Sequence, residues 1–312
     1  MRFQLKFFTP FAIRFAVATV ALTNLSGCFD NQTKRPNVDA KISPDGSWLV
    51  AAEYGKTGTE LKIKKLNPSS STWQKISVPE KTGSFNFSSS TNDLLITYTL
   101  GEGRIFAKLH SDEGYVATDI YRSELGLAFP YEVSSDKYLI QAVTRVTPNG
   151  YPIHRWKLVT SHKVLAEIGD EFGPPYDSVN LVGDSGFFIV TDIDKPNNVR
   201  AFALPNGVTP DIKKYVVPET IGLKCDRAMK NCLQENRYLD NAGYYSRIFR
   251  IVDNEKCELL GFPRSIRRIS MTPDGKYAAI VGAKDTKTKL AVDVVSFIGG
   301  ACTSFIKFTE EI

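Results

Sequence analysis

A pattern that recurs at intervals of 42 to 48 residues constrains the fold of this 312-residue chain more than any other feature. The segment KISPDGSWLVAAEY at 41–54 is matched by SMTPDGKYAAIVGA at 270–283. In both, an apolar residue leads into a Pro-Asp-Gly turn, and an aromatic residue and a run of strand formers follow. This is the pattern of a β-hairpin. Weaker copies begin at residues 85, 131, 179 and 221.

The apolar residue before each turn gives the period. These residues are Ile42, Phe87, Val133, Leu181, Leu223 and Met271, with steps of 45, 46, 48, 42 and 48. A period in this range with four short strands per unit predicts an all-β fold, a β-propeller of six blades with four antiparallel strands each. A seven- or eight-bladed ring is the alternative, but eight blades would leave only about 36 residues for each.

The two clean turns, SPDG and TPDG, are each followed by an aromatic residue, Trp48 or Tyr277. They resemble the repeats of TolB-type propellers, which are periplasmic and six-bladed. Only two of the six units carry the motif cleanly, and the chain lacks the extra domain of TolB itself. The first and last blades of a propeller must meet to hide their edges. We see no spare N-terminal strand, so we expect closure by packing between blade faces.

The N-terminal 27 residues have the order of a secretory signal peptide: basic residues, an apolar run at 15–22, then small residues. The run is shorter than the roughly 18 to 20 residues of a membrane-spanning helix. The block Leu25-Ser26-Gly27-Cys28 resembles the lipobox of bacterial lipoproteins. That resemblance implies cleavage before Cys28 and lipidation of its sulfur and new amino group. A plain secreted protein with an unmodified Cys28 is the alternative.

These features predict a signal peptide at 1–27, a lipidated cysteine with a polar tether at 28–38, and a propeller domain at 39–312. In lipoproteins of enteric type, an aspartate directly after the cysteine usually signals retention in the inner membrane. Here Phe29 takes that place and Asp30 follows one position later. The resemblance therefore favours the outer membrane, with the domain facing the periplasm, over the inner membrane or the cell surface.

The charge of the chain gives little indication of its partners. The formal net charge is +5, and three of the basic residues lie in the signal peptide, so the mature chain carries +2. No clustered excess of lysine and arginine resembles a nucleic-acid-binding surface. We therefore expect contact with the membrane through a lipid and with an envelope protein, and no nucleic acid.

Four cysteines remain in the predicted domain, namely Cys225, Cys232, Cys257 and Cys302. An even number in an exported protein suggests two disulfides, with three connectivities open. The first two flank the fifth hairpin turn, and the last two are 45 residues apart, about one repeat. We predict the pairs Cys225–Cys232 and Cys257–Cys302. A zinc site is the alternative, but the chain has no close second pair of cysteines and only three histidines.

Motifs for catalysis or metal binding are sparse, and each has a simpler explanation. The GDSG sequence at 183–186 is similar to the nucleophile loop of trypsin-like proteases, but it lies where the fourth repeat needs its turn. DIDKPNN at 192–198 offers four oxygen ligands, without the central glycine and terminal glutamate of a calcium loop. His110, His154 and His162 fall in scattered positions. We assign no catalytic residue, metal or cofactor.

Arg264, Arg267 and Arg268 cluster where the chain enters the inner strand of the sixth blade. They are candidates for contact with an anionic partner or glycan at one mouth of the channel, although solvated loop charges are the simpler explanation. Two functional classes follow. The first is a protein-binding scaffold within an envelope assembly, which we favour. The second is a glycan or peptide hydrolase or lyase whose site lies in the channel.

Overall fold

The structure is a computed structural model. It describes residues 37–311, apart from gaps at 56–57, 67–71, 80–81, 102, 135, 162, 173–177, 183–185, 192–198, 206–211, 213–215 and 284–289. The predicted signal peptide, Cys28 and nearly all of the predicted tether lie outside these residues. Val38–Ile312 forms one compact unit. In the described part of the chain, no helix has the length and apolar character needed to cross a bilayer.

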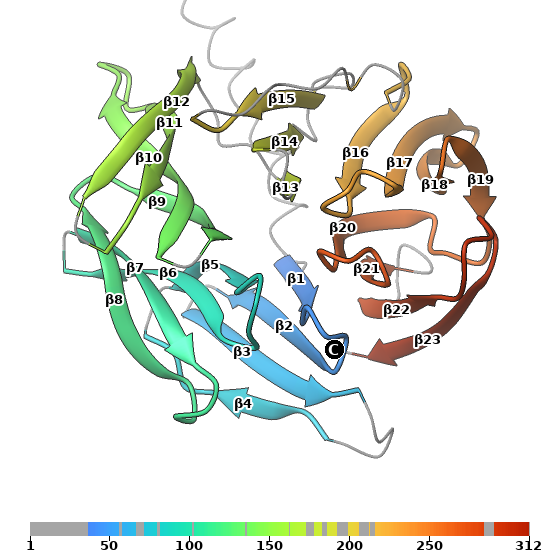
Figure 1. The fold of residues 1–312 in the computed structure, drawn as a ribbon, viewed down its shortest axis with the longest axis horizontal. Helices are drawn as coiled ribbons and strands as arrows, with labels where there is room; N and C mark the ends of the chain where they lie inside the picture. Colours follow the sequence, from blue (N-terminus) through green and yellow to red (C-terminus); the bar gives the residue numbers. More distant parts are fainter. Residues whose placement is uncertain are drawn as a thin grey trace, which may run out of the picture. The chain divides into compact units, whose positions relative to one another are not determined.

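The compact unit consists of six antiparallel sheets, each made of strands consecutive in the chain. Figure 1 shows the sheets following one another around a ring, with the first strand of each sheet innermost. The first three sheets contain β1 (Asn37–Ile42), β2 (Trp48–Gly55), β3 (Gly58–Lys65), β4 (Gln74–Ile76), β5 (Thr82–Phe87), β6 (Leu94–Leu100), β7 (Gly103–His110), β8 (Val116–Ser123), β9 (Leu127–Ser134), β10 (Lys137–Val146), β11 (Pro152–Val159) and β12 (Val164–Phe172).

The other three sheets complete the ring. They contain β13 (Ser178–Val182), β14 (Phe187–Thr191), β15 (Val199–Ala203), β16 (Thr220–Cys225), β17 (Asn231–Asp240), β18 (Gly243–Val252), β19 (Glu255–Leu259), β20 (Ser265–Met271), β21 (Tyr277–Ala283), β22 (Ala291–Phe297) and β23 (Phe305–Glu311). The predicted propeller with four-stranded antiparallel blades is confirmed. Five sheets have four strands, whereas the fourth has three in the described residues. Six complete four-stranded blades are therefore not established.

The repeated turns form as predicted. In the first blade the N–H of Ser43 donates to the carbonyl of Trp48 at 2.9 Å, and Gly46 supplies the positive φ of +72° that closes the turn. In the sixth blade Thr272 and Tyr277 make the same 2.9 Å bond around Gly275. Each repeat thus pairs the first two strands of its sheet.

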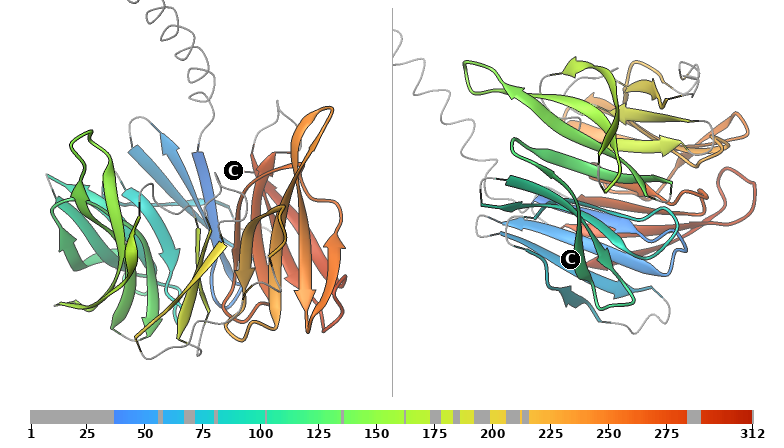
Figure 2. Two further views of the ribbon diagram at one scale, coloured as in Figure 1. Left: turned by 90° about the horizontal axis from the view of Figure 1, so that it is seen from above. Right: turned by 60° about the vertical axis from the view of Figure 1, so that its left-hand side comes forward.

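Since the strands alternate in direction, the turns separate onto two faces of the ring, as Figure 2 shows. The turns between first and second strands open on one face, which we call the pocket face. The hairpins between second and third strands, and the links between sheets, open on the other, which we call the hairpin face. The chain enters β1 at the hairpin face.

The core lies between neighbouring sheets rather than at the centre of the ring. The first and last sheets bury one such layer, in which Val38 and Ala40 of β1 pack with Val292 and Val294 of β22. The indole N–H of Trp73 also donates to the carbonyl of Glu311 at 3.2 Å. Within the described part of the chain, the first four strands pair only with one another, so closure rests on packing between faces, as expected.

A cationic pocket at the centre of the ring

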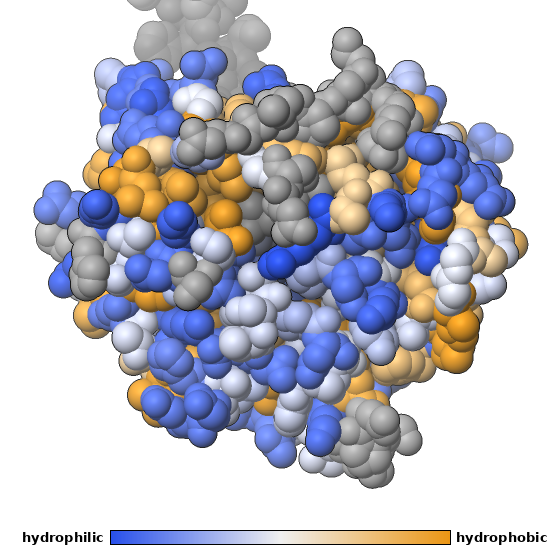
Figure 3. Space-filling model, in the orientation of Figure 1, coloured by the Kyte–Doolittle hydropathy of each residue, from blue (hydrophilic) through white to orange (hydrophobic). Residues whose placement is uncertain are grey.

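A pocket of about 110 Å³ opens at the centre of the pocket face. Its polar lining comes from the inner strands and from the turns that follow them. The apolar Leu204 completes the lining from the end of the fourth sheet. The lining residues are Lys41, Ile42, Pro44, Asn86, Phe87, Ser88, Ser89, Tyr131, Glu132, Val133, Leu204, Lys224, Arg227, Ser270, Met271 and Pro273. In Figure 3, strongly hydrophilic atoms lie at the centre of the ring.

One position of the repeat supplies most of the polar side chains. It is the residue directly before the apolar residue that precedes each turn, and it is occupied by Lys41, Asn86, Glu132, Lys224 and Ser270. In the fifth blade the turn begins at Asp226, whose N–H donates to the carbonyl of Asn231 at 2.9 Å. The apolar residue there is therefore Cys225, and our choice of Leu223 was two residues early because a disulfide cysteine replaces the usual apolar side chain.

The pocket carries an excess of positive charge. Lys41, Lys224 and Arg227 line it, and Lys41 lies 3.4 Å from Asp39 on the same strand. Burial first, and then the charge of Lys41, lower the pKa of Lys224 well below its usual range. Burial lowers this pKa because the charged ammonium is poorly solvated in the pocket. An anionic partner would offset that cost of desolvation.

The single acid among the described lining residues is already engaged. The Glu132 carboxylate accepts hydrogen bonds from the Ser88 hydroxyl, from the Ser89 N–H at 2.9 Å and from the Ser89 hydroxyl at 3.2 Å. Lys108 lies 3.9 Å from its other oxygen. These contacts join the turn of the second blade to the inner strand of the third. Glu132 therefore holds two blades together and leaves the positive charge of the pocket in excess.

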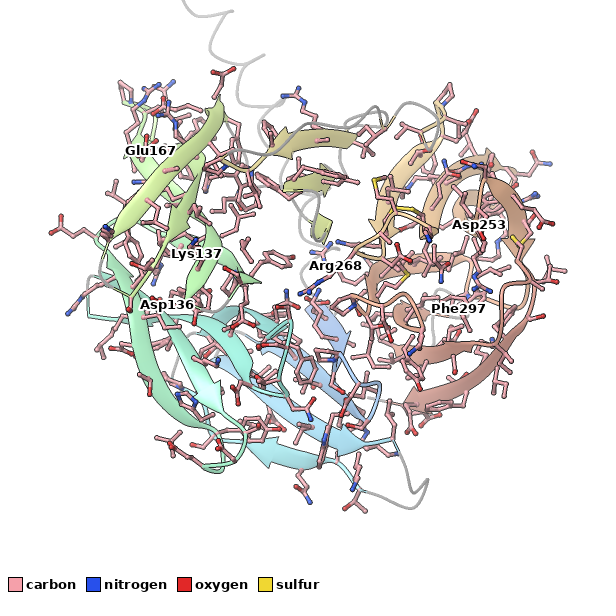
Figure 4. All side chains as sticks on the ribbon, in the orientation of Figure 1. Asp136, Lys137, Glu167, Asp253, Arg268 and Phe297 are labelled. Carbon is pink, nitrogen blue, oxygen red and sulfur yellow. A yellow bond between two sulfur atoms is a disulfide. The ribbon has the colours of Figure 1, made fainter. Side chains whose placement is uncertain are left out.

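The three arginines predicted as an anion-binding cluster do not act together. Arg264 forms an ion pair with Asp240 and lies over the ring of Tyr245, 5.1 Å from its centre. Arg267 is exposed beside a β-bulge between Ile266 and Arg268. Arg268 points toward the centre of the ring, as Figure 4 shows. The three are separated because successive side chains of a strand point to opposite faces, and because Arg264 lies before the first residue of β20.

A buried acid lies next to this channel-facing arginine. Burial raises the pKa of Glu235 to about 7, although the hydrogen bond from Ser246 and the charges of Arg237 and Arg268 oppose the shift. Its carboxyl oxygen would be 3.5 Å from a Cβ placed on Gly222, two residues before Lys224. The polar lining thus continues below the pocket, with a carboxyl group that is half protonated near neutral pH.

Both predicted disulfides are present. Cys225 is joined to Cys232 and Cys257 to Cys302. The first directly adjoins the pocket, because Lys224 precedes Cys225 and Arg227 lies in the turn that the bond closes. The second links the outer part of the fifth blade to the β22–β23 turn. The alternative of a zinc site does not apply to these cysteines.

The described residues contain one group with the spacing of metal ligands, Asp93, His110 and Asp112. Asp93 is already occupied, since it accepts from the N–H of Ser111 at 2.8 Å and lies 3.3 Å from Lys108. The group therefore gives no basis for assigning a metal.

The other motifs contribute little to this pocket. His154 is buried and stacks on Phe172 with ring centres 5.8 Å apart. His162, residues 183–185 of the GDSG motif and the DIDKPNN segment lie outside the described residues. The sequence analysis missed Lys41, Lys224 and Arg227. Aligning the repeats by their turns, rather than by their apolar residues, would have placed both lysines at one channel-facing position.

No protein-family model and no curated protein matches this chain. Solved structures of similar fold include hydrazine synthase of Kuenenia stuttgartiensis, with a TM-score of 0.52 and 12% identity over 85% of this chain and 78% of that one. An oligogalacturonate lyase in complex with manganese has a TM-score of 0.51 and 10% identity, covering 89% of this chain and 90% of that one.

A third structure, the acylaminoacyl peptidase of Pyrococcus horikoshii, has a TM-score of 0.51 and 10% identity over 90% of this chain. The match covers 46% of the peptidase. At identities this low the likenesses concern the fold alone. Together with the ring of antiparallel sheets, they identify the compact unit as a β-propeller.

Proposed function

We propose that this protein is a lipid-anchored binding module of the bacterial envelope, and that its central pocket takes an anionic group of a partner protein. The observation that carries the proposal is the charge of the lining: Lys41, Lys224 and Arg227 face one small hollow, while Glu132 is engaged in joining two blades. A carboxylate in this pocket would gain charge-assisted hydrogen bonds in a partly desolvated site.

Two adjoining hollows suit an acidic side chain together with its peptide. The pocket taken alone holds about 110 Å³, which is room for a side chain and less than the about 300 to 1,000 Å³ of a typical small-molecule site. A second hollow of about 350 Å³ adjoins it and shares Pro44, Ser89, Arg227 and Pro273. An acidic side chain can enter the first hollow while the rest of its peptide lies over the second. The apolar residues of the lining, such as Phe87 and Met271, would contact the stem of that side chain.

The lipobox at Leu25–Cys28 supports the anchor, and the absence of an aspartate directly after Cys28 supports the outer membrane. Fatty-acid labelling of the wild-type protein and of Cys28→Ser tests it. We expect label on the wild type alone. Label retained on the variant, or absent from both, contradicts the anchor.

Photo-crosslinking in intact cells tests the binding function. A photoreactive residue at Ser89 or Pro273 should capture an envelope protein, and a second substitution, Lys224→Glu, should abolish the capture. Lys163→Glu is the matched control, since it makes the same charge change at an exposed residue on the same face. Capture that survives Lys224→Glu, or that Lys163→Glu removes equally, contradicts a role for the pocket.

One observation favours the enzyme alternative. A lysine whose pKa is lowered is a better candidate for a general base than an ordinary lysine, and burial lowers the pKa of Lys224. Purified protein should then cleave an acidic glycan or peptide, and Lys224→Met should abolish the cleavage without changing the thermal midpoint. Failure to turn over any such substrate, with binding retained, favours the binding module.

A further inference from the structure

The hairpin face carries exposed apolar side chains at the tips of three separate hairpins. These are the β6–β7, β10–β11 and β17–β18 hairpins, which belong to the second, third and fifth blades. The exposed side chains and their exposed fractions are Leu100 54%, Val146 52%, Tyr151 69%, Leu239 67% and Tyr244 73%. The two longer hairpins each carry an exposed tyrosine and an exposed aliphatic residue near the tip, so the same chemistry occurs twice.

The β17–β18 hairpin is built to project. Its two strands pair over ten rows, but β16 accompanies β17 only as far as Asn236 and β19 accompanies β18 only from Ile248. Rings brace the projecting part: Tyr238 and Tyr245 have centres 5.6 Å apart, and Arg247 lies over both. Leu239 and Tyr244 pair on the opposite side of this braced hairpin.

The pocket face differs in chemistry. Its turns include the two Pro-Asp-Gly turns and the serine-rich turn at 88–93. Large apolar residues are exposed there too, namely Val116, Val164, Leu165 and Ile298, but they lie on or beside outer strands and none is aromatic. In the described residues, exposed tyrosines are confined to the hairpin face. The two faces therefore suit different neighbours.

The chain also enters the propeller at the hairpin face. Cys28 lies nine positions before Asn37, the first residue of β1. Even when fully extended, this stretch spans at most about 30 Å. A lipid on Cys28 therefore keeps the hairpin face within that distance of the bilayer, whereas the pocket face lies farther along the strands.

We propose that the hairpin face rests on the lipid bilayer, with Tyr151, Leu239 and Tyr244 inserted in the interfacial region. This inference rests on the anchor of the proposed function. Tyrosine suits the interface because its ring is apolar and its hydroxyl stays hydrated. The contacts are separate tips on three blades and not a continuous groove. A deformable surface can meet all of them at once, whereas a protein partner would need a matching shape. The pocket then opens away from the membrane.

Quenching by brominated lipids tests the inference on the lipidated, processed protein, purified from membranes and reconstituted in vesicles with brominated acyl chains. Tyr151→Trp and Tyr244→Trp should each lose fluorescence relative to vesicles without bromine. Ile298→Trp is the matched control on the pocket face, where the residue is 50% exposed, and it should lose none. Equal signals for all three variants overturn the inference and leave a protein as the partner of these tips.

The anchor and the membrane-facing surface fail in different ways. If protein that carries fatty acid on Cys28 shows no quenching of Tyr151→Trp and Tyr244→Trp, the proposed membrane-facing surface is wrong and the anchor stands. If labelling shows no fatty acid, the anchor fails, and the unlipidated protein is mixed with the same vesicles. Quenching confined to Tyr151→Trp and Tyr244→Trp then still supports the surface, and its absence overturns it.

Discussion

Gly46 of the first blade lies directly against the ring of Tyr277 in the sixth. A Cβ added to Gly46 would stand 2.5 Å from Cδ2 of that ring and closer still to Cε2, far inside van der Waals contact. Gly46 also has a φ of +72°, which side chains rarely adopt. The glycine of the repeated turn thus serves twice, because it closes its own hairpin and lets the first and last blades approach.

Gly46→Ala should therefore loosen the contact between the first and last blades that closes the ring. We expect a loss of about 2–4 kcal/mol from the free energy of unfolding, since left-handed strain adds to overpacking. Gly101→Ala is the control, because Gly101 has a φ of +59° but a Cβ added there would meet nothing within 4 Å. Denaturant titration of both variants measures the difference. Equal losses would mean that Tyr277 moves aside without cost.

The two disulfides should differ in their contributions. By loop-closure entropy, a loop of 45 residues stabilises by about 4 kcal/mol and one of 7 by about 2.5 kcal/mol. Replacing Cys257 and Cys302 by alanine should thus lower the thermal midpoint more than replacing Cys225 and Cys232. Replacing Cys225 and Cys232 should instead weaken capture of the partner, because Lys224 and Arg227 lie next to the Cys225–Cys232 disulfide. Unchanged capture would show that the turn keeps its shape without the disulfide.

Gln141 should be replaceable by leucine with a gain in stability. Its side chain is fully buried in β10, and in the described part of the chain neither its oxygen nor its nitrogen has a hydrogen-bond partner. We expect a gain of about 1 kcal/mol from removing an unsatisfied amide. Gln234→Leu is the contrasting variant, since Gln234 donates to Thr220 at 2.6 Å and its loss should destabilise. A loss for Gln141→Leu would indicate a buried water bound there.

Stability should fall as pH rises toward neutrality, because of Glu235. Its pKa is about 7 in the folded protein and 4.5 when unperturbed, so the folded state binds the proton more tightly. The contribution is therefore present below about pH 4.5 and is lost as pH rises through about 7, by about 3 kcal/mol at most. Glu235→Gln should remove this slope. If the free energy of unfolding changes with pH in the same way for the wild type and for Glu235→Gln, Glu235 is ionised in the folded protein.

Partner binding should weaken as pH rises, because the lowered pKa of Lys224 makes its charge vulnerable to deprotonation. Affinity for a captured acidic peptide, measured between about pH 6 and about pH 9, should fall in the wild type. Lys224→Arg should bind with much weaker pH dependence, since a guanidinium stays protonated. The same fall in both proteins would assign the effect to the ligand.

The sequence was sufficient to predict the propeller and the two disulfides, because these features depend on the spacing of the repeat. It was insufficient for the pocket, whose residues come from different blades and become neighbours only when the ring closes. Lys41 and Lys224 are 183 positions apart and carry no shared motif. The arginines show the opposite case: residues close in sequence do not form one cluster, because Arg267 and Arg268 are successive residues of a strand and point to opposite faces, and Arg264 precedes that strand.

The shared repeat position of Lys41, Asn86, Glu132, Lys224 and Ser270 has an evolutionary consequence. Five of the six blades each supply one side chain to the pocket from this position, on a strand whose hydrogen bonds are made by the backbone. A single substitution can therefore change the chemistry of the pocket without altering the pairing of any strand, at three of these positions. Glu132 and Ser270 are the exceptions, since each joins two blades, Glu132 through the N–H of Ser89 and Ser270 through the carbonyl of Ala40. Related propellers can thus diversify their ligands one blade at a time, and an engineer can do the same.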